Sequence, residues 1–249
     1  MGNFCFVAFF AAVAIAGASG CGTSRPYTTA VSVLCDVSEK EYTDSAGYRK
    51  DRAMFTGFIV GDTSKPGNEG GYIRLTALNA LSQNTVHSAT LPPPEAGILG
   101  SNPLNRKDEI NAFQKQVTAM FDNFGRAYRK DAGQSKIYQG LCRELTRLAD
   151  DKADRKIMVV YSDFLENSAL FSLYPPHNLK YLQDPIQFAD SVLRQDCPLP
   201  NLNGIDIYLV AYRTESNDEA VNQALKFWET VLEHAGARVE SGAGLGSIR

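Results

Sequence analysis

The sequence has few histidines and cysteines, and it lacks the motifs of several common enzyme classes. Its three histidines, His87, His177 and His234, are scattered, and no cysteines have zinc-ligand spacing. There is no Gly-rich phosphate loop and no Gly-x-Ser-x-Gly motif, which excludes a P-loop enzyme and an α/β-hydrolase triad. Lys and Arg number 25 against 28 Asp and Glu without a basic stripe, so we expect no nucleic-acid partner.

A hydrophobic run of membrane-spanning length is missing as well. The uncharged run at residues 4–18 would extend about 22 Å as a helix, short of a hydrocarbon core of roughly 30 Å. We therefore predict a signal peptide at residues 1–20. The following Ala18-Ser19-Gly20-Cys21 resembles the bacterial lipoprotein processing box. That resemblance implies lipid on Cys21 and a protein held in the bacterial cell envelope by its N-terminal lipid, with plain secretion as the alternative.

Cysteine is too sparse to staple a fold of this size. After removal of the signal peptide and with lipid on Cys21, three cysteines remain: Cys35, Cys142 and Cys197. An odd number cannot all pair with one another. Cys35 lies in a predicted strand and Cys142 inside a predicted helix, where buried thiols are common. The sequence leaves their disulfide state open, and it predicts no disulfide framework.

What is present is an alternation of apolar strands and amphipathic helices. Residues 155–162 form a short apolar run rich in β-branched side chains, as in a strand buried on both faces. The pattern predicts a three-layer α/β/α fold: a mostly parallel, doubly wound sheet with an antiparallel edge strand. Strands are expected at residues 30–37, 72–78, 85–91, 204–212 and 237–239, and helices at 42–60, 105–130, 135–148, 185–193 and 217–234. Residues 21–29 are predicted as a tether, 30–240 as one domain and 241–249 as a flexible tail.

Acidic and hydroxyl side chains follow two of these strands. Asp36 and Ser38 end the first strand, and Asp163 ends the strand at 155–162. Because ligands bind at the carboxyl ends of parallel strands, neighbouring strands would bring the two aspartates together at one edge. Ser135 is placed to cap the helix that follows it. A Rossmann dinucleotide site is excluded, since Asp36-Val37-Ser38 occupies the turn where glycines belong.

This order, strand–Asp-x-Ser, then Ser before a helix, then strand–Ser-Asp, resembles the von Willebrand factor A-like family in its divergent bacterial members. The resemblance implies a metal-ion-dependent adhesion site that holds Mg²⁺ or Mn²⁺ and a partner protein's carboxylate. Its ligands by position are Asp36, Ser38, Ser135 and Asp163.

Lys40 stands where that motif has a second Ser. An ammonium about 4 Å from a divalent ion costs roughly 8 kcal/mol at an effective dielectric of 20, whereas millimolar binding is worth about 4 kcal/mol. Lys40 therefore modifies the site: its stem can turn the charge to solvent, or it can pair with Asp36 or Asp163 in place of the metal. The balance favours a degenerate site without a cofactor.

Two functions remain open. The first is a non-enzymatic protein-interaction module, and the second is a magnesium-dependent, phosphatase-like hydrolase with Asp36 as nucleophile and Asp163 on the metal. Each residue also has a structural interpretation, because Asp, Ser and Thr commonly bond local backbone groups. We interpret Trp228 as a core residue, Tyr161 as packing, and Glu166 and Asn167 as solvated loop residues.

Overall fold

The computed structural model describes residues 27–37, 46–61, 69–78, 86–94, 102–126 and 135–247. The predicted signal peptide at 1–20, Cys21, Ser38 and Lys40 lie outside these residues. Within them, no helix has the length and apolar character needed to cross a membrane.

The centre of the fold is a six-stranded sheet in the order β3-β2-β1-β4-β5-β6. β3 pairs antiparallel with β2, and every other pairing is parallel. The predicted mostly parallel sheet with an antiparallel edge strand is therefore confirmed. The strands are β1 (Tyr27–Asp36), β2 (Glu69–Leu78), β3 (Val86–Leu91), β4 (Arg155–Ser162), β5 (Ile205–Ala211) and β6 (Arg238–Gly242).

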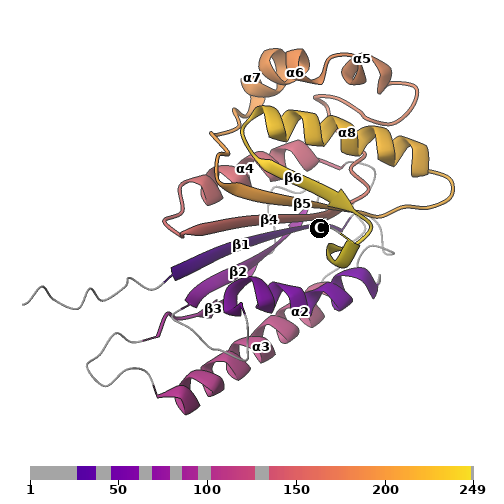
Figure 1. Ribbon diagram of the computed structural model, residues 1–249. Coiled ribbons are helices and arrows are strands. Elements are labelled where there is room, and N and C mark those ends of the chain that lie inside the picture. The colour runs from indigo at the N-terminus through magenta and orange to yellow at the C-terminus, as the bar shows by residue number, and fades with distance from the viewer. Residues whose placement is uncertain are drawn as a thin grey trace, which may run out of the picture.

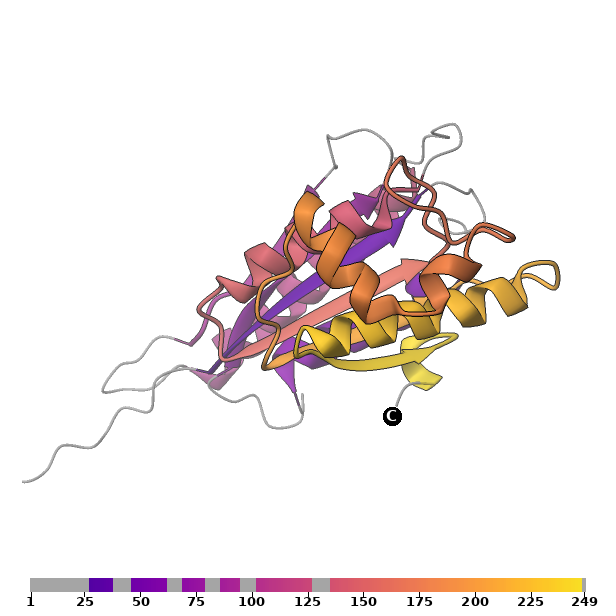
Figure 2. The same cartoon turned by 90° about the horizontal axis from the view of Figure 1, so that it is seen from above.

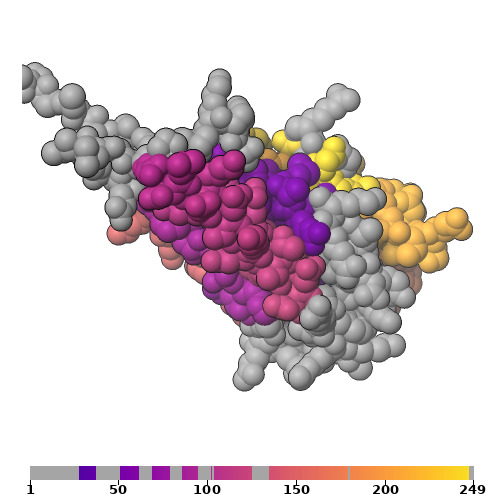
Figure 3. Space-filling view, turned by 90° about the horizontal axis from the view of Figure 1, so that it is seen from below, coloured from indigo at the N-terminus to yellow at the C-terminus, as the bar shows by residue number. Residues whose placement is uncertain are grey.

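Helices cover both faces of this sheet (Figure 1). α2 (Ala46–Val60) and α3 (Pro103–Arg126) lie on one face, where Figure 3 shows them side by side over the surface. α4 (Ile137–Ala149) and α8 (Asp218–His234) lie on the other face. The predicted three-layer α/β/α architecture is confirmed.

β4 shows why the chain folds this way. Its side chains alternate between the two layers: Ile157, Val159 and Tyr161 join the core under α2 and α3, while Met158 and Val160 join the core under α4 and α8. Each fully buried side chain of this size contributes about 1.5–3 kcal/mol. A strand that is apolar on both faces is removed from water on both sides when it lies between two helical layers.

Between β4 and β5 the chain makes an excursion of short helical segments outside α8 (Figures 1 and 2). The segments are α5 (Leu179–Leu182), α6 (Pro185–Phe188), a π-helix (Ala189–Leu193) and α7 (Arg194–Asp196), where the sequence pattern predicted one helix. Aromatic packing joins the excursion to α8, because Phe171 contacts both Phe188 of α6 and Trp228 of α8. Trp228 is a fully buried core residue, as predicted.

Both ends of the domain differ from the prediction. β1 begins at Tyr27, inside the expected tether of residues 21–29. The expected flexible tail at 241–249 is wrong for residues 241–247, since β6 runs to Gly242 and a 3-10 turn (Leu245–Ser247) follows. Leu245 is 2% exposed and its N–H donates to Asp51 Oδ2 at 3.2 Å, so apolar burial and a buried hydrogen bond fix this segment.

Candidate functional site

The carboxyl edge of the sheet brings together residues that are far apart in sequence. β1 and β4 are parallel neighbours, with Cys35 opposite Tyr161. Asp36 therefore lies across from Ser162, which is the residue directly before Asp163. The predicted adjacency of the two aspartate-bearing strands is confirmed.

Asp36 is the centre of this edge. It is 2% exposed, and its Oδ2 accepts hydrogen bonds from Ser135 Oγ at 3.1 Å and from Ser162 Oγ at 2.9 Å. Two hydroxyl donors on one oxygen offset much of the cost of burying a carboxylate. Ser162 was not among the predicted site residues, although it directly precedes Asp163 in the Ser-Asp motif.

Ser135 reaches Asp36 for a different reason than the sequence indicated. The predicted role of Ser135 as the N-cap is wrong: α4 begins at Ile137, and its N-cap residue is Lys136. Ser135 instead forms a backbone bridge with Asn167, with N–H···O distances of 3.1 and 2.9 Å. This bridge ties the start of α4 to the loop after β4, and it leaves the Ser135 hydroxyl directed at Asp36.

Asp163 is held by a tight local turn. Its Oδ1 accepts the Leu165 N–H at 3.0 Å, and Ser162 Oγ accepts the Phe164 N–H at 3.0 Å. Phe164 has a φ of 62°, in the left-handed region that is uncommon for a residue other than glycine. Its ring is fully buried, and burial of the ring offsets the cost of this conformation.

Glu166 is buried, so its interpretation as a solvated loop residue is wrong. It is 1% exposed, and its Oε2 accepts the Tyr138 N–H at 2.8 Å, in the first turn of α4. Burial raises the pKa of Glu166 to about 7, although the hydrogen bond from Tyr138 works in the opposite direction. Asn167, by contrast, is half-buried and serves as the bridge partner of Ser135. Local sequence carries no signal for Glu166, because its partner lies 28 residues away.

The oxygen donors at this edge fit a hard cation in chemical type. Asp36, Asp163 and Ser135 come from three separate segments, and Mg²⁺ commonly binds one or two carboxylates and completes its shell with water. Among the residues that the structure describes, however, no three His, Cys, Asp or Glu side chains are grouped to hold a metal ion. Metal binding here would depend on hydroxyl oxygens and water as well as the two carboxylates.

Sheet order and helical layers together give a von Willebrand factor A-like fold. Human COPII-coat protein Sec24c matches 91% of this chain at 13% identity with a TM-score of 0.50, and the match covers 31% of Sec24c. The vWF domain of the type V pili tip protein Mfa5 from Porphyromonas gingivalis matches 90% of the chain and 93% of its own length, at 13% identity and a TM-score of 0.42.

A third similar structure holds a metal ion. Proximal thread matrix protein 1 from the mussel byssus, solved with a zinc-occupied MIDAS motif, matches 89% of this chain at 14% identity with a TM-score of 0.37. The match covers 45% of that protein. No protein-family model and no curated protein sequence matches the chain. At these identities the likeness concerns the fold alone.

Proposed function

We propose that the protein is an envelope-tethered, non-enzymatic interaction module that binds another protein at the carboxyl edge of its sheet. The observation that carries the proposal is that the hydroxyls of Ser135 and Ser162 both bond Asp36 at that edge, where Asp163 directly follows Ser162. Ligands bind at this edge of open parallel sheets.

The metal site at this edge is weak or degenerate. Asp36, Ser135 and Asp163 would hold Mg²⁺ or Mn²⁺, and the ion would supply an open position for a partner's carboxylate. The hydrogen bonds from Ser135 and Ser162 stabilise the Asp36 carboxylate without an ion. Lys40, four residues after Asp36 in the sequence, would oppose a cation there if its ammonium faced the site.

The cell envelope is the proposed location. Lipid on Cys21 would hold the protein there, with secretion as the alternative. The disulfide between Cys142 and Cys197 supports export, because disulfides persist in oxidising compartments and are rare in the cytosol. Replacing Cys21 by Ala should move the protein from the membrane fraction to the soluble fraction; retention would contradict the lipid anchor.

Photo-crosslinking in intact cells tests the interaction surface. A photoreactive phenylalanine analogue replaces Ala169, which is exposed in the loop after β4, and in a matched control it replaces Gln114, exposed on α3. We expect a discrete protein adduct from position 169 and none from position 114. No adduct at 169, or equal adducts at both positions, would contradict binding at this edge.

Thermal unfolding tests the metal. For a dissociation constant of about 1 mM, about 20 mM Mg²⁺ or Mn²⁺ stabilises by roughly 2 kcal/mol, a rise in Tm of roughly 4–7 °C for a domain of this size. The weak site predicts a rise of this order and the degenerate site an unchanged Tm; a much larger rise would contradict both. Hydrolysis of a generic phosphoester that is lost in Asp36→Ala would contradict the non-enzymatic assignment.

A further inference from the structure

A second candidate binding site lies in the outer helical layer. A hollow of about 340 Å³ is bounded by the π-helix, by the loop at residues 198–201 and by the last turn of α8. Pro198, Leu199 and Pro200 contribute apolar lining, while Asp190 and Arg194 add charge and His234 an imidazole. The volume is at the lower end of the roughly 300–1,000 Å³ of ligand pockets. It therefore suits a small molecule or the end of a larger one.

Arg194 is a cation at this hollow that has no ion-pair partner in the described part of the chain. Asp190 and Arg194 have a spacing that permits an ion pair along a regular α-helix, but Asp190 Oδ2 instead lies 3.4 Å from His234 Nε2 of α8, a contact that is an ion pair when His234 is protonated. Asp196 accepts a hydrogen bond from Gln139 at 3.4 Å. Arg194 is exposed and has no ion pair within 4.0 Å in the described part of the chain. The π-helix before Arg194 is a second sign, since such turns frequently occur at functional sites.

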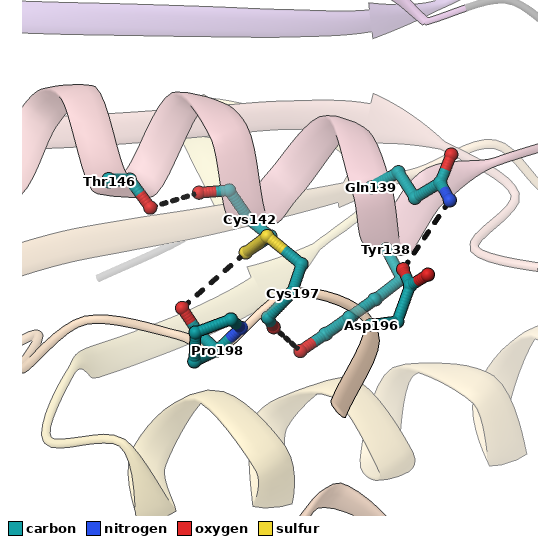
Figure 4. Close-up of a disulfide and its surroundings, with 7 residues drawn as sticks. All are labelled: Tyr138, Gln139, Cys142, Thr146, Asp196, Cys197 and Pro198. Atoms are coloured by element: carbon teal, nitrogen blue, oxygen red, sulfur yellow. Dashed lines mark hydrogen bonds between the residues drawn. A yellow bond between two sulfur atoms is a disulfide. The ribbon is translucent and has the colours of Figure 1, made fainter. Parts of the chain in front are cut away.

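The walls of the hollow are held in place before any ligand arrives. The disulfide joins Cys142 of α4 to Cys197, immediately after α7, and the Tyr138 hydroxyl donates to the Cys197 carbonyl oxygen (Figure 4). These links fix the segment that carries Arg194 against α4. A pre-formed site loses less conformational freedom on binding than a flexible one.

We propose that this hollow binds a carboxylate carried by a small apolar group. The guanidinium of Arg194 pairs with the carboxylate, for which its planar fork of donors is suited. Pro198, Leu199 and Pro200 receive the apolar group. The same chemistry is presented by a free apolar acid and by the C-terminal residue of a peptide. The site goes beyond the proposed strand-edge function, since Asp36, Ser135 and Asp163 do not line it.

Titration calorimetry on the full chain at neutral pH tests the ligand class. The probes are N-acetyl-leucine, its neutral amide, and a short peptide ending in leucine with either a free or an amidated C-terminus. We expect each acid to bind at least about tenfold more tightly than its amide, because the charge-assisted pair to arginine is lost in the amide. Binding of the peptide acid alone would identify a peptide C-terminus as the source, whereas binding of both acids would identify any small apolar carboxylate.

Arg194→Gln tests the residue, with Arg143→Gln as the matched control, because Arg143 is exposed on α4 and does not line the hollow. We expect Arg194→Gln to weaken acid binding about tenfold and Arg143→Gln to leave it unchanged. Equal binding of acid and amide, binding of neither acid, or full binding by Arg194→Gln would each overturn the proposal. Crosslinking at position 169 does not involve Arg194, so this proposal and the strand-edge function fail independently.

Discussion

Replacing Glu166 by Gln should stabilise the protein at high pH and have little effect at low pH. The pKa of Glu166 is about 7 in the folded protein against an ordinary value of 4.5, and burial is the main cause. That difference corresponds to about 3 kcal/mol. Gln keeps a carbonyl oxygen that can accept the Tyr138 N–H, and it carries no charge at any pH.

The sign follows from which state binds the proton more tightly. Because the folded-state pKa is raised, the free energy of unfolding falls as pH increases from about 4.5 to about 7, and the loss is complete above that range. The variant lacks this loss. Its stability relative to the natural protein should therefore rise by about 3 kcal/mol between about pH 4.5 and pH 8. Any cost of burying the amide NH₂ is the same at every pH, so only the change with pH is diagnostic.

Urea denaturation at several pH values measures this difference directly. Glu233→Gln is the matched control, because Glu233 is exposed near the end of α8. We expect the control to follow the natural protein at each pH and Glu166→Gln to diverge from it as pH rises. Parallel curves for Glu166→Gln and the natural protein would refute the raised pKa, and a stability difference that shifts toward the variant as pH falls would refute its direction.

Three further changes test the packing and the strand edge by urea or thermal denaturation. Replacing both Cys142 and Cys197 by Ala should lower stability by up to about 4 kcal/mol, since the disulfide closes a loop with a sequence separation of 55 residues, and a natural protein insensitive to reductant would contradict this. Leu245→Ala should cost about 2–4 kcal/mol if the 3-10 turn is part of the core; a cost near zero would show that it is not. Ser162→Ala should cost about 1–3 kcal/mol by removing a donor to buried Asp36, and an unchanged Tm would contradict that bond.

The sheet was predictable because its signals are local. Strands β1, β4 and β5 are short apolar runs, and each such run must be buried on both faces. Asp36 and Asp163 follow two of these runs, and parallel pairing then places them at one edge. The position of the candidate site could therefore be predicted from which segments are strands and which strands are neighbours.

The contacts that build the edge were not predictable, because they join distant segments. Ser135 bonds Asp36 across 99 residues, and Ser162 does so across 126. Ser135 could be interpreted only through its local helix-capping propensity, which the backbone bridge to Asn167 overrides. Glu166 follows a strand end, so its local sequence resembles that of a solvated loop residue. Its burial depends on the start of α4, where the Tyr138 N–H donates to it.

These contacts also bear on whether the edge is a working surface or only a well-packed strand end. The loop after β4 is bound to the start of α4 twice, at Ser135 and at Tyr138, and Ser135 is bonded to Asp36. The candidate site is therefore built on connected, ordered segments, as pre-organised binding sites are. Burying Asp36, Asp163 and Glu166 at one edge costs folding free energy that neutral side chains would not cost. Buried acidic side chains that lower stability in this way are expected at binding sites. We therefore expect the partner protein to bind at this edge of the sheet.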